Sequence, residues 1–135
     1  AIFLVMEVGE VDLNQVLQQQ TLRDEEKHDN KGCVLNMNFI RLTWQQMLSA
    51  VHSIHQERII HGDLKPANFL FVRGVLKLID FGIAKAIQSD DTTNIYRESQ
   101  IGTLNYMSPE SILDTGTGKD GARMKCGRAS DVWSL

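Results

Sequence analysis

Residues 61–68, with the sequence HGDLKPAN, constrain this chain most, because a second polar motif, DFG at residues 80–82, follows at short range. The first motif holds an acid, a cation and an amide at Asp63, Lys65 and Asn68, and the second adds the acid Asp80. Between them lie two apolar, strand-like runs joined by an Arg-Gly turn. We therefore predict that the two motifs flank a β-hairpin.

The residue types in these motifs suit phosphoryl transfer. Asp63 lies in a predicted loop, where its carboxylate could orient the proton of an attacking hydroxyl. Lys65 is placed to offset charge on the transferred group, and Asn68 completes the catalytic series. The side-chain oxygens of Asn68 and Asp80 are hard ligands of the kind that magnesium prefers. An isolated loop Asp more often caps a turn, but the ordered series favours the catalytic interpretation.

Composition indicates a folded domain and narrows the range of partners. The 135 residues are 42% hydrophobic and 23% charged, with a net charge of -3. Such a charge provides no general basic field, so we expect neither nucleic acid nor a membrane surface as partner. Cys33 and Cys126 lie far apart, which favours a reducing intracellular compartment over a disulfide framework.

The first third of the chain predicts one strand, two helices and a loop. The apolar run at residues 2–6 is typical of a strand buried on both faces. Residues 12–17 can begin a helix that residues 18–20 extend, and the alternating charges at residues 23–31 predict a solvated loop. A second helix follows from Asn38, its expected N-cap. Its apolar stripe comprises Ile40, Trp44, Met47, Leu48, Val51 and Ile54.

The remaining segments predict strands around the two motifs and then longer connections. Residues 59–60 should form a short strand, and residues 69–72 should pair with residues 75–79. Residues 114–127, rich in glycine and basic side chains, are typical of an exposed insertion before a helix opened by Ser130 and Asp131.

Three segments, residues 61–70, 76–84 and 102–110, resemble the protein kinase superfamily, and more narrowly the dual-specificity monopolar-spindle checkpoint (TTK) kinases. The resemblance implies an α+β, protein kinase-like fold that is truncated. Residues 1–135 would be a partial kinase domain. Residues 1–9 would hold the last strand and hinge of the N-lobe, and residues 10–135 the first part of the mainly helical C-lobe.

The same resemblance implies a function. The whole protein would be a serine/threonine kinase, with tyrosine as a second acceptor, that uses ATP and Mg²⁺ on protein substrates in spindle-checkpoint signalling. Kinetochore partners and a location in nucleus, kinetochore and cytoplasm follow only from this resemblance. No glycine loop or ATP-anchoring lysine precedes Ala1, so we expect this chain alone to be inactive. The alternative is a catalytically inactive kinase-like scaffold or binding module.

Several residues take nucleotide-site roles by resemblance. Met6 would be the gatekeeper, Glu7 and Val8 the hinge, and Leu70 the floor of the adenine pocket. Asp12 would either reach the ribose or cap a helix, since Asp is a preferred cap residue.

Other roles concern regulation and support. Residues 83–101 resemble an activation segment, and Thr92, Thr93 and Thr103 are candidates for autophosphorylation. Thr103 has a competing role as a contact of the catalytic Asp and Lys. Structural support is implied for His61, Phe81, Gly82, Glu110 and Asp131. Gly62 stands where many kinases have an arginine that links the activation segment to the catalytic loop, and Lys85 or Arg97 could substitute for it.

Overall fold

The computed structural model describes residues 2–3, 5–26, 35–81, 84–87, 94–97, 103–113 and 124–135. These residues form two compact units. Unit 1 comprises residues 1–47 and 66–79, and unit 2 comprises residues 48–65 and 80–135. Within the described ranges, no helix combines the length and apolar character needed to cross a bilayer.

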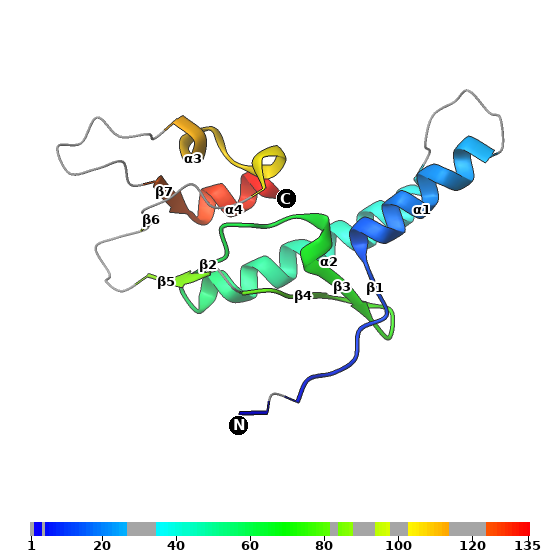
Figure 1. The fold of residues 1–135 in the computed structure, drawn as a ribbon, viewed down its shortest axis with the longest axis horizontal. Helices are drawn as coiled ribbons and strands as arrows, with labels where there is room; N and C mark the ends of the chain where they lie inside the picture. Colours follow the sequence, from blue (N-terminus) through cyan, green and yellow to red (C-terminus); the bar gives the residue numbers. More distant parts are fainter. Residues whose placement is uncertain are drawn as a thin grey trace. The chain divides into compact units, whose positions relative to one another are not determined.

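Unit 1 is built on a three-stranded antiparallel sheet (Figure 1). Its strands are β1 (Val11–Asp12), β3 (Phe69–Val72) and β4 (Val75–Leu78), in the order β1-β3-β4. The predicted hairpin is confirmed, with Phe69 opposite Leu78 and Val72 opposite Val75. Its two turn residues both have positive φ, 51° at Arg73 and 76° at Gly74, which matches the twist of the flanking strands.

The helix of unit 1, α1 (Leu13–Glu26), begins where the sequence predicts but runs further. Asp12 caps it, because the Asp12 Oδ1 accepts a hydrogen bond from the backbone N–H of Gln15 at 2.9 Å. The solvated loop predicted at residues 23–31 is wrong for residues 23–26, which are helical. Arg and Glu are good helix formers that do not require burial, so their charge pattern did not end the helix. Residues 27–31 lie outside the described ranges.

The predicted buried strand at residues 2–6 is also wrong. The described residues there have no strand structure, and Ile2, Phe3 and Val5 are 88–100% exposed. A β-branched, apolar run specifies a strand only through neighbours that cover it. No described strand pairs with residues 2–6, so their backbone forms no sheet hydrogen bonds with a described strand, and the described apolar side chains there are not covered.

The long helix α2 (Met37–Gln56) carries the chain from unit 1 into unit 2. Its N-cap is Asn36, not Asn38, because the Asn36 Oδ1 accepts from the backbone N–H of Asn38 at 2.8 Å. The buried line also differs from the predicted stripe. Met47 and Val51 are buried as expected together with Thr43, and Ile54 is partly buried, whereas the other three members are 37–46% exposed, namely Ile40, Trp44 and Leu48.

Unit 2 consists of two antiparallel ribbons and short helices. The predicted strand β2 (Ile59–Ile60) pairs with β5 (Lys85–Ala86), and β6 (Asn94–Arg97) pairs with β7 (Met124–Gly127). The exposed insertion predicted at residues 114–127 is therefore wrong at its end. Backbone pairing with a distant segment, which local composition does not encode, makes residues 124–127 a strand. Residues 114–123 lie outside the described ranges.

Helices complete unit 2. They are η2 (Leu104–Tyr106), α3 (Pro109–Leu113) and α4 (Arg128–Ser134), and the last contains Asp131 as predicted. A small core joins the ribbons, in which Ile60, Ile87 and Cys126 are buried and Met107 packs against them. This core lies directly beside residue 61, where the first motif begins.

Candidate active site

The first motif forms a loop between β2 and the short 3₁₀ helix η1 (Pro66–Asn68). Leu64 anchors it with only 1% of its surface exposed, so the polar residues on either side are held near the surface. Gly62 has a φ of 74°, a left-handed conformation that costs glycine little and other residues more. The backbone of the loop is therefore compatible with glycine at the position where many kinases have arginine.

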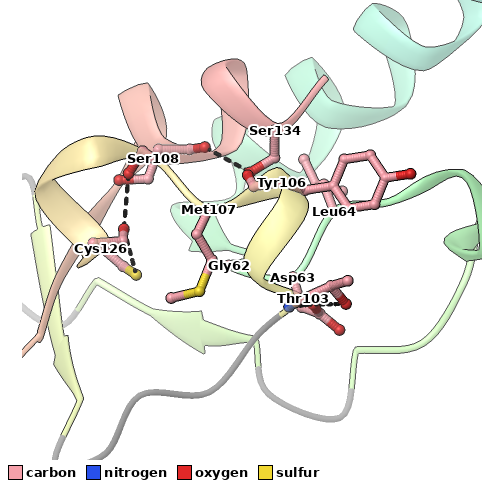
Figure 2. A pocket seen from close by; sticks show the side chains of 11 residues that line it. Gly62, Asp63, Leu64, Thr103, Tyr106, Met107, Ser108, Cys126 and Ser134 are labelled. Carbon is pink, nitrogen blue, oxygen red and sulfur yellow. Dashed lines mark hydrogen bonds between the residues drawn. The ribbon is translucent and has the colours of Figure 1, made fainter.

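Asp63, Lys65 and Thr103 form a closed group of hydrogen bonds in unit 2 (Figure 2 shows Asp63 and Thr103). The Lys65 ammonium donates to the Asp63 Oδ2 at 3.0 Å and to the Thr103 Oγ1 at 3.1 Å. The Asp63 Oδ1 accepts from the backbone N–H of Thr103 at 2.9 Å and from its hydroxyl at 3.2 Å. The Asp63 carboxylate is thus oriented from two sides by a cation and a threonine.

The side chains of Asp63 and Lys65 are partly exposed, so they are accessible from solvent while their hydrogen bonds hold them in place. The Asp63 side chain is 16% exposed and the Lys65 side chain is 30% exposed. A carboxylate held in this way can accept a hydroxyl proton, and an adjacent ammonium stabilises negative charge as it develops. Thr103 serves here as the contact of Asp63 and Lys65, the competing role that the sequence left open.

Asp131 supports the catalytic loop through hydrogen bonds to the loop backbone. It is fully buried, and its two oxygens accept from the backbone N–H groups of His61 at 2.9 Å and Gly62 at 2.7 Å. The His55 Nε2 lies 2.8 Å from the Asp131 Oδ2. A buried carboxylate is costly unless hydrogen bonds satisfy it, and these three contacts do so. The resemblance implied the contact with the loop backbone.

Sequence reasoning missed His55 as a supporting residue. It lies in the last turn of α2, and its backbone carbonyl accepts from the guanidinium of Arg128 at 2.9 Å. A weak signal was present, because a His near the end of an amphipathic helix can reach across to the next element. Nothing in the local pattern names Asp131, 76 residues away, as its partner.

His61 and Phe81 lie together, as the resemblance implied for supporting residues. Their ring centroids are 5.6 Å apart with an interplanar angle of 57°, and His61 is fully buried. The His61 Nδ1 accepts from the backbone N–H of Asp63 at 3.3 Å, which places the proton of a neutral ring on Nε2. Beside Phe81, Asp80 has a φ of 63°, a conformation that Asp tolerates better than most residues. Gly82 lies outside the described residues.

A small pocket opens behind the catalytic loop (Figure 2). Gly62, Asp63 and Leu64 form one side, and residues from η2, α3, β7 and α4 form the other. A chain of polar contacts crosses its far wall, where the Ser108 and Ser111 hydroxyls lie 2.8 Å apart and the Cys126 thiol lies 3.7 Å from Ser111. The free thiol of Cys126 is buried.

Unit 1 brings some of the predicted nucleotide-site residues together. Asp12 and Leu70 are direct cross-strand partners, and a Cβ placed on Gly9 would lie 1.9 Å from the Leu70 Cδ2. Glu7 forms an ion pair with Lys77 at 3.0 Å. Met6 and Val8 are 71% and 87% exposed, and no described contact joins them to this group. Asp12 acts as the helix cap, the second of its two expected roles.

Asn68 has the burial and the free side-chain oxygen expected of a metal ligand. It is 2% exposed, and its Oδ1 is buried without a hydrogen-bond partner among the described residues. Its backbone carbonyl accepts from Ile79 at 2.8 Å, which ties it to the end of the hairpin. Leaving a buried amide oxygen unsatisfied is costly, so an oxygen-seeking cation such as Mg²⁺ fits this atom. Asn68 belongs to unit 1, and the second predicted ligand, Asp80, belongs to unit 2.

The described residues offer few candidate metal ligands. Across the described ranges, no group of three or more His, Cys, Asp or Glu side chains forms a metal centre. Magnesium commonly binds through one or two protein oxygens plus phosphate oxygens and water, so an Asn and an Asp are chemically sufficient.

The other predicted residues have separate outcomes. Glu110 is exposed on α3, and its Oε1 accepts from the Ser130 hydroxyl at 2.9 Å. Thr92 and Thr93 lie outside the described residues, so their assignment as autophosphorylation candidates stays a prediction. The side chains of Lys85 and Arg97, the suggested substitutes for the missing arginine, also lie outside the description.

Comparison with known proteins places these features in a family. The family model of the protein kinase domain matches residues 1–135. The chain is 64% identical over 135 residues to "Probable serine/threonine-protein kinase mps1" of Dictyostelium discoideum, covering 99% of the chain and 13% of that protein. It is 53% identical to "Serine/threonine-protein kinase mph1" of Schizosaccharomyces pombe, covering 98% of the chain and 18% of the relative.

A mammalian relative is similar over the same span. "Dual specificity protein kinase TTK" of Mus musculus is 46% identical, with 99% of the chain and 14% of that protein covered. The chain thus spans less than a fifth of the length of these three relatives. The matched domain covers the whole chain, and the contacts of Asp63 and of the buried Asp131 agree with it. The chain therefore belongs to the protein kinase family.

Proposed function

We propose that the protein of which this chain is a part is a serine/threonine kinase that transfers the γ-phosphate of ATP to protein hydroxyls, with tyrosine as a second acceptor. The observation that carries this proposal is the oriented carboxylate of Asp63, held by Lys65 and Thr103. The names of the similar proteins in Dictyostelium and mouse support serine/threonine and dual-specificity activity respectively.

Each residue has a defined part in this reaction. Asp63 accepts and orients the proton of the acceptor hydroxyl, and Lys65 offsets the charge of the phosphoryl group in the transition state. Asn68 and Asp80 would each supply an oxygen to Mg²⁺. When bound, the metal neutralises the phosphates of ATP. Leu70, beside Gly9, would form the floor under the adenine.

The cellular setting follows by resemblance alone. We place the protein in mitotic spindle-checkpoint signalling, with kinetochore proteins as partners and a location in nucleus, kinetochore and cytoplasm. Similarity to the mps1, mph1 and TTK kinases over nearly the whole chain supports this placement. Microscopy of the fluorescently tagged full-length protein through mitosis tests it, and absence from kinetochores at every stage would contradict it.

An activity assay tests the chemistry. Full-length wild type, Asp63→Ala and Asp80→Ala would be compared for transfer from labelled ATP to a generic protein substrate. Loss of the oriented carboxylate should lower kcat by about a hundredfold or more. Glu57→Ala, which removes an exposed carboxylate from unit 2, is the matched control and should retain wild-type activity.

The same assay separates the kinase from a scaffold. Equal signal from wild type, Asp63→Ala and Asp80→Ala would remove the catalytic assignment. A scaffold also predicts that partner capture survives in all three while no transfer occurs in any. The intact group of Asp63, Lys65 and Thr103 favours the enzyme.

A further inference from the structure

Strand β6, which lies in the segment that resembles an activation segment, pairs with β7, and β7 leads directly into the helix that supports the catalytic loop. Asn94 lies opposite Gly127 and Arg97 opposite Met124. Both strands belong to unit 2, and Figure 1 shows β7 running into α4. The pairing therefore links residues 94–97 to the strand that leads into the element containing Asp131.

The junction between β7 and α4 is tightly connected. Gly127 is both the last residue of β7 and the N-cap of α4, and its backbone N–H donates to the Ser130 hydroxyl at 3.3 Å. That hydroxyl in turn donates to Glu110 on α3 at 2.9 Å. The next residue after Ser130 is Asp131. Asp131 thus lies about one helical turn after the end of β7, so the path from β7 to Asp131 is short.

Asp131 then acts directly on the catalytic loop. Its two oxygens accept from the backbone N–H groups of His61 and Gly62, the two residues immediately before Asp63. Because Asp131 has no exposed surface, water cannot replace these contacts without opening the unit. The position of the Asp63 backbone is thus tied to the position of α4.

A second contact reaches the loop from β7 by another route. Cys126 is 2% exposed and packs in one core with Ile60, the residue before His61, and with Ile87. Packed interiors transmit displacement because they have few voids. β7 is therefore connected to the catalytic loop in two ways, through Asp131 on α4 and through Ile60, the last residue before the loop.

We propose that pairing of β6 with β7 positions the catalytic loop, so that β7 carries the regulatory coupling that Gly62 cannot provide. Glycine at position 62 has no cation to meet a phosphate on the activation segment. Pairing of two strands alone contributes little stability, and β7, unlike β6, is also held by the core around Cys126, so loss of the β6–β7 pairing is the step that a small perturbation can cause. Loss of the pairing removes one of the contacts that position β7, loosens Asp131 and Ile60 through it, and lowers activity. This proposal deepens the proposed function and rests on it for its catalytic consequence.

Proline variants in β6 test the coupling in the full-length protein. In an antiparallel ladder, alternate residues donate to the partner strand, so at least one of Ile95→Pro and Tyr96→Pro removes a ladder hydrogen bond. Ile95→Thr keeps the N–H and a β-branched side chain, and is the matched control. Hydrogen–deuterium exchange reports the conformational effect, and kcat and KM for ATP report the catalytic one.

The expected result is a linked change at two distant places. In an effective proline variant, amide exchange should rise about tenfold at residues 124–127 and at residues 59–64, while the unit 1 hairpin at residues 69–78 stays unchanged. We expect kcat to fall about tenfold, with KM for ATP altered less than about twofold. Increased exchange at residues 124–127 with unchanged exchange at residues 59–64 and unchanged kcat would overturn the proposal. No increase at residues 124–127 in either proline variant would also overturn it.

A disulfide provides the opposite perturbation. Ile95 is the register partner of the free Cys126, and directly opposite residues in an antiparallel pair have the Cα spacing that a disulfide needs. Oxidised Ile95→Cys should slow exchange at residues 59–64, and reductant should reverse the effect. Failure of the bond to form, or its formation without added protection there, contradicts the proposal.

The two proposals fail separately. If exchange at residues 59–64 follows the β6 variants while wild type transfers no phosphate, the coupling stands and the kinase assignment fails. If wild type transfers phosphate but amide exchange at residues 59–64 does not change in the β6 variants, the kinase assignment stands and the coupling fails.

Discussion

Thr103 is the residue at which a regulatory and a catalytic role compete. Its sequence context made it a candidate for autophosphorylation, yet its hydroxyl lies 3.1 Å from the Lys65 ammonium and 3.2 Å from the Asp63 carboxylate. A phosphate on this oxygen would place negative charge beside Asp63 and occupy Lys65. The contacts therefore favour an unmodified hydroxyl in the active arrangement.

Substitution of Thr103 tests this arrangement. Thr103→Ala removes hydrogen bonds to two charged groups and should lower kcat about tenfold to a hundredfold. Thr103→Ser keeps the hydroxyl and should remain within about threefold of wild type. Steady-state kinetics on the full-length protein measure both. An alanine variant as active as the serine variant would show that the hydroxyl contacts do not serve catalysis.

Gly9 must lack a side chain because of a close neighbour, a requirement that no sequence motif predicts. A Cβ at this position would overlap the Leu70 side chain, whereas a Cβ on Gly74 would meet nothing within 4 Å. Both are glycines of unit 1, but only Gly9 is required by a neighbour. Gly74 is required by its φ of 76°.

This contrast gives a matched pair of variants. Gly9→Ala should displace Leu70 and weaken ATP binding several-fold, because Leu70 is assigned to the floor of the adenine pocket. Gly74→Ala should leave ATP binding unchanged and lower the free energy of unfolding by about 1 kcal/mol through backbone strain alone. Calorimetric titration with ATP and thermal denaturation of the full-length protein separate the two effects. Equal ATP affinity in both variants would count against the role of Leu70.

At the scale of elements, local signals predicted most of the strands and helices near the motifs. The hairpin at residues 69–78 followed from two apolar runs around Arg73 and Gly74, and α2 followed from its periodicity. The start of α2 was missed because Asn36 and Asn38 are both good caps, and only the hydrogen bond between them distinguishes the two.

The cap assignment can be measured directly. Asn36→Ala should lower the free energy of unfolding by about 1 kcal/mol, since it removes the side-chain acceptor at the helix N-terminus. Asn38→Ala keeps its backbone N–H and that acceptor, so it should change stability by much less. Thermal denaturation of the two full-length variants in parallel is sufficient. The reverse order of stabilities would restore Asn38 as the cap.

Long-range pairing accounts for what the sequence could not predict. The β7 strand forms because residues 124–127 meet β6, and His55 supports the loop because it meets Asp131. Neither contact leaves a local pattern in composition or periodicity. In contrast, Asp63, Lys65, Asn68 and Asp80 were identifiable because their chemistry is compressed into two short motifs.

At the scale of the whole molecule, many large apolar side chains of the described residues are exposed to solvent. Ile2, Phe3 and Val5 are almost fully exposed, and Trp44 and Trp133 are 46% and 61% exposed. Soluble proteins rarely expose contiguous apolar surface unless another element or partner covers it. The 135-residue chain by itself should therefore associate with itself.

A charge substitution at α2 tests this expectation. Trp44→Lys removes an exposed apolar side chain and should reduce self-association of the 135-residue chain at micromolar concentration. Gln45→Lys adds the same charge at an exposed polar neighbour and is the matched control. Light scattering coupled to size-exclusion chromatography measures the mass of each. Equal masses for the two variants at every concentration would show that Trp44 takes no part in association.

The burial of Cys126 gives unit 2 a natural reporter. A thiol with 2% exposure cannot react with a reagent until the surrounding residues separate, so its rate of alkylation counts opening events of the native protein. Peptide mass spectrometry can follow alkylation at this position without any engineered residue. Inhibitors, nucleotides or phosphorylation could then be ranked by how long they keep one sulfur atom hidden.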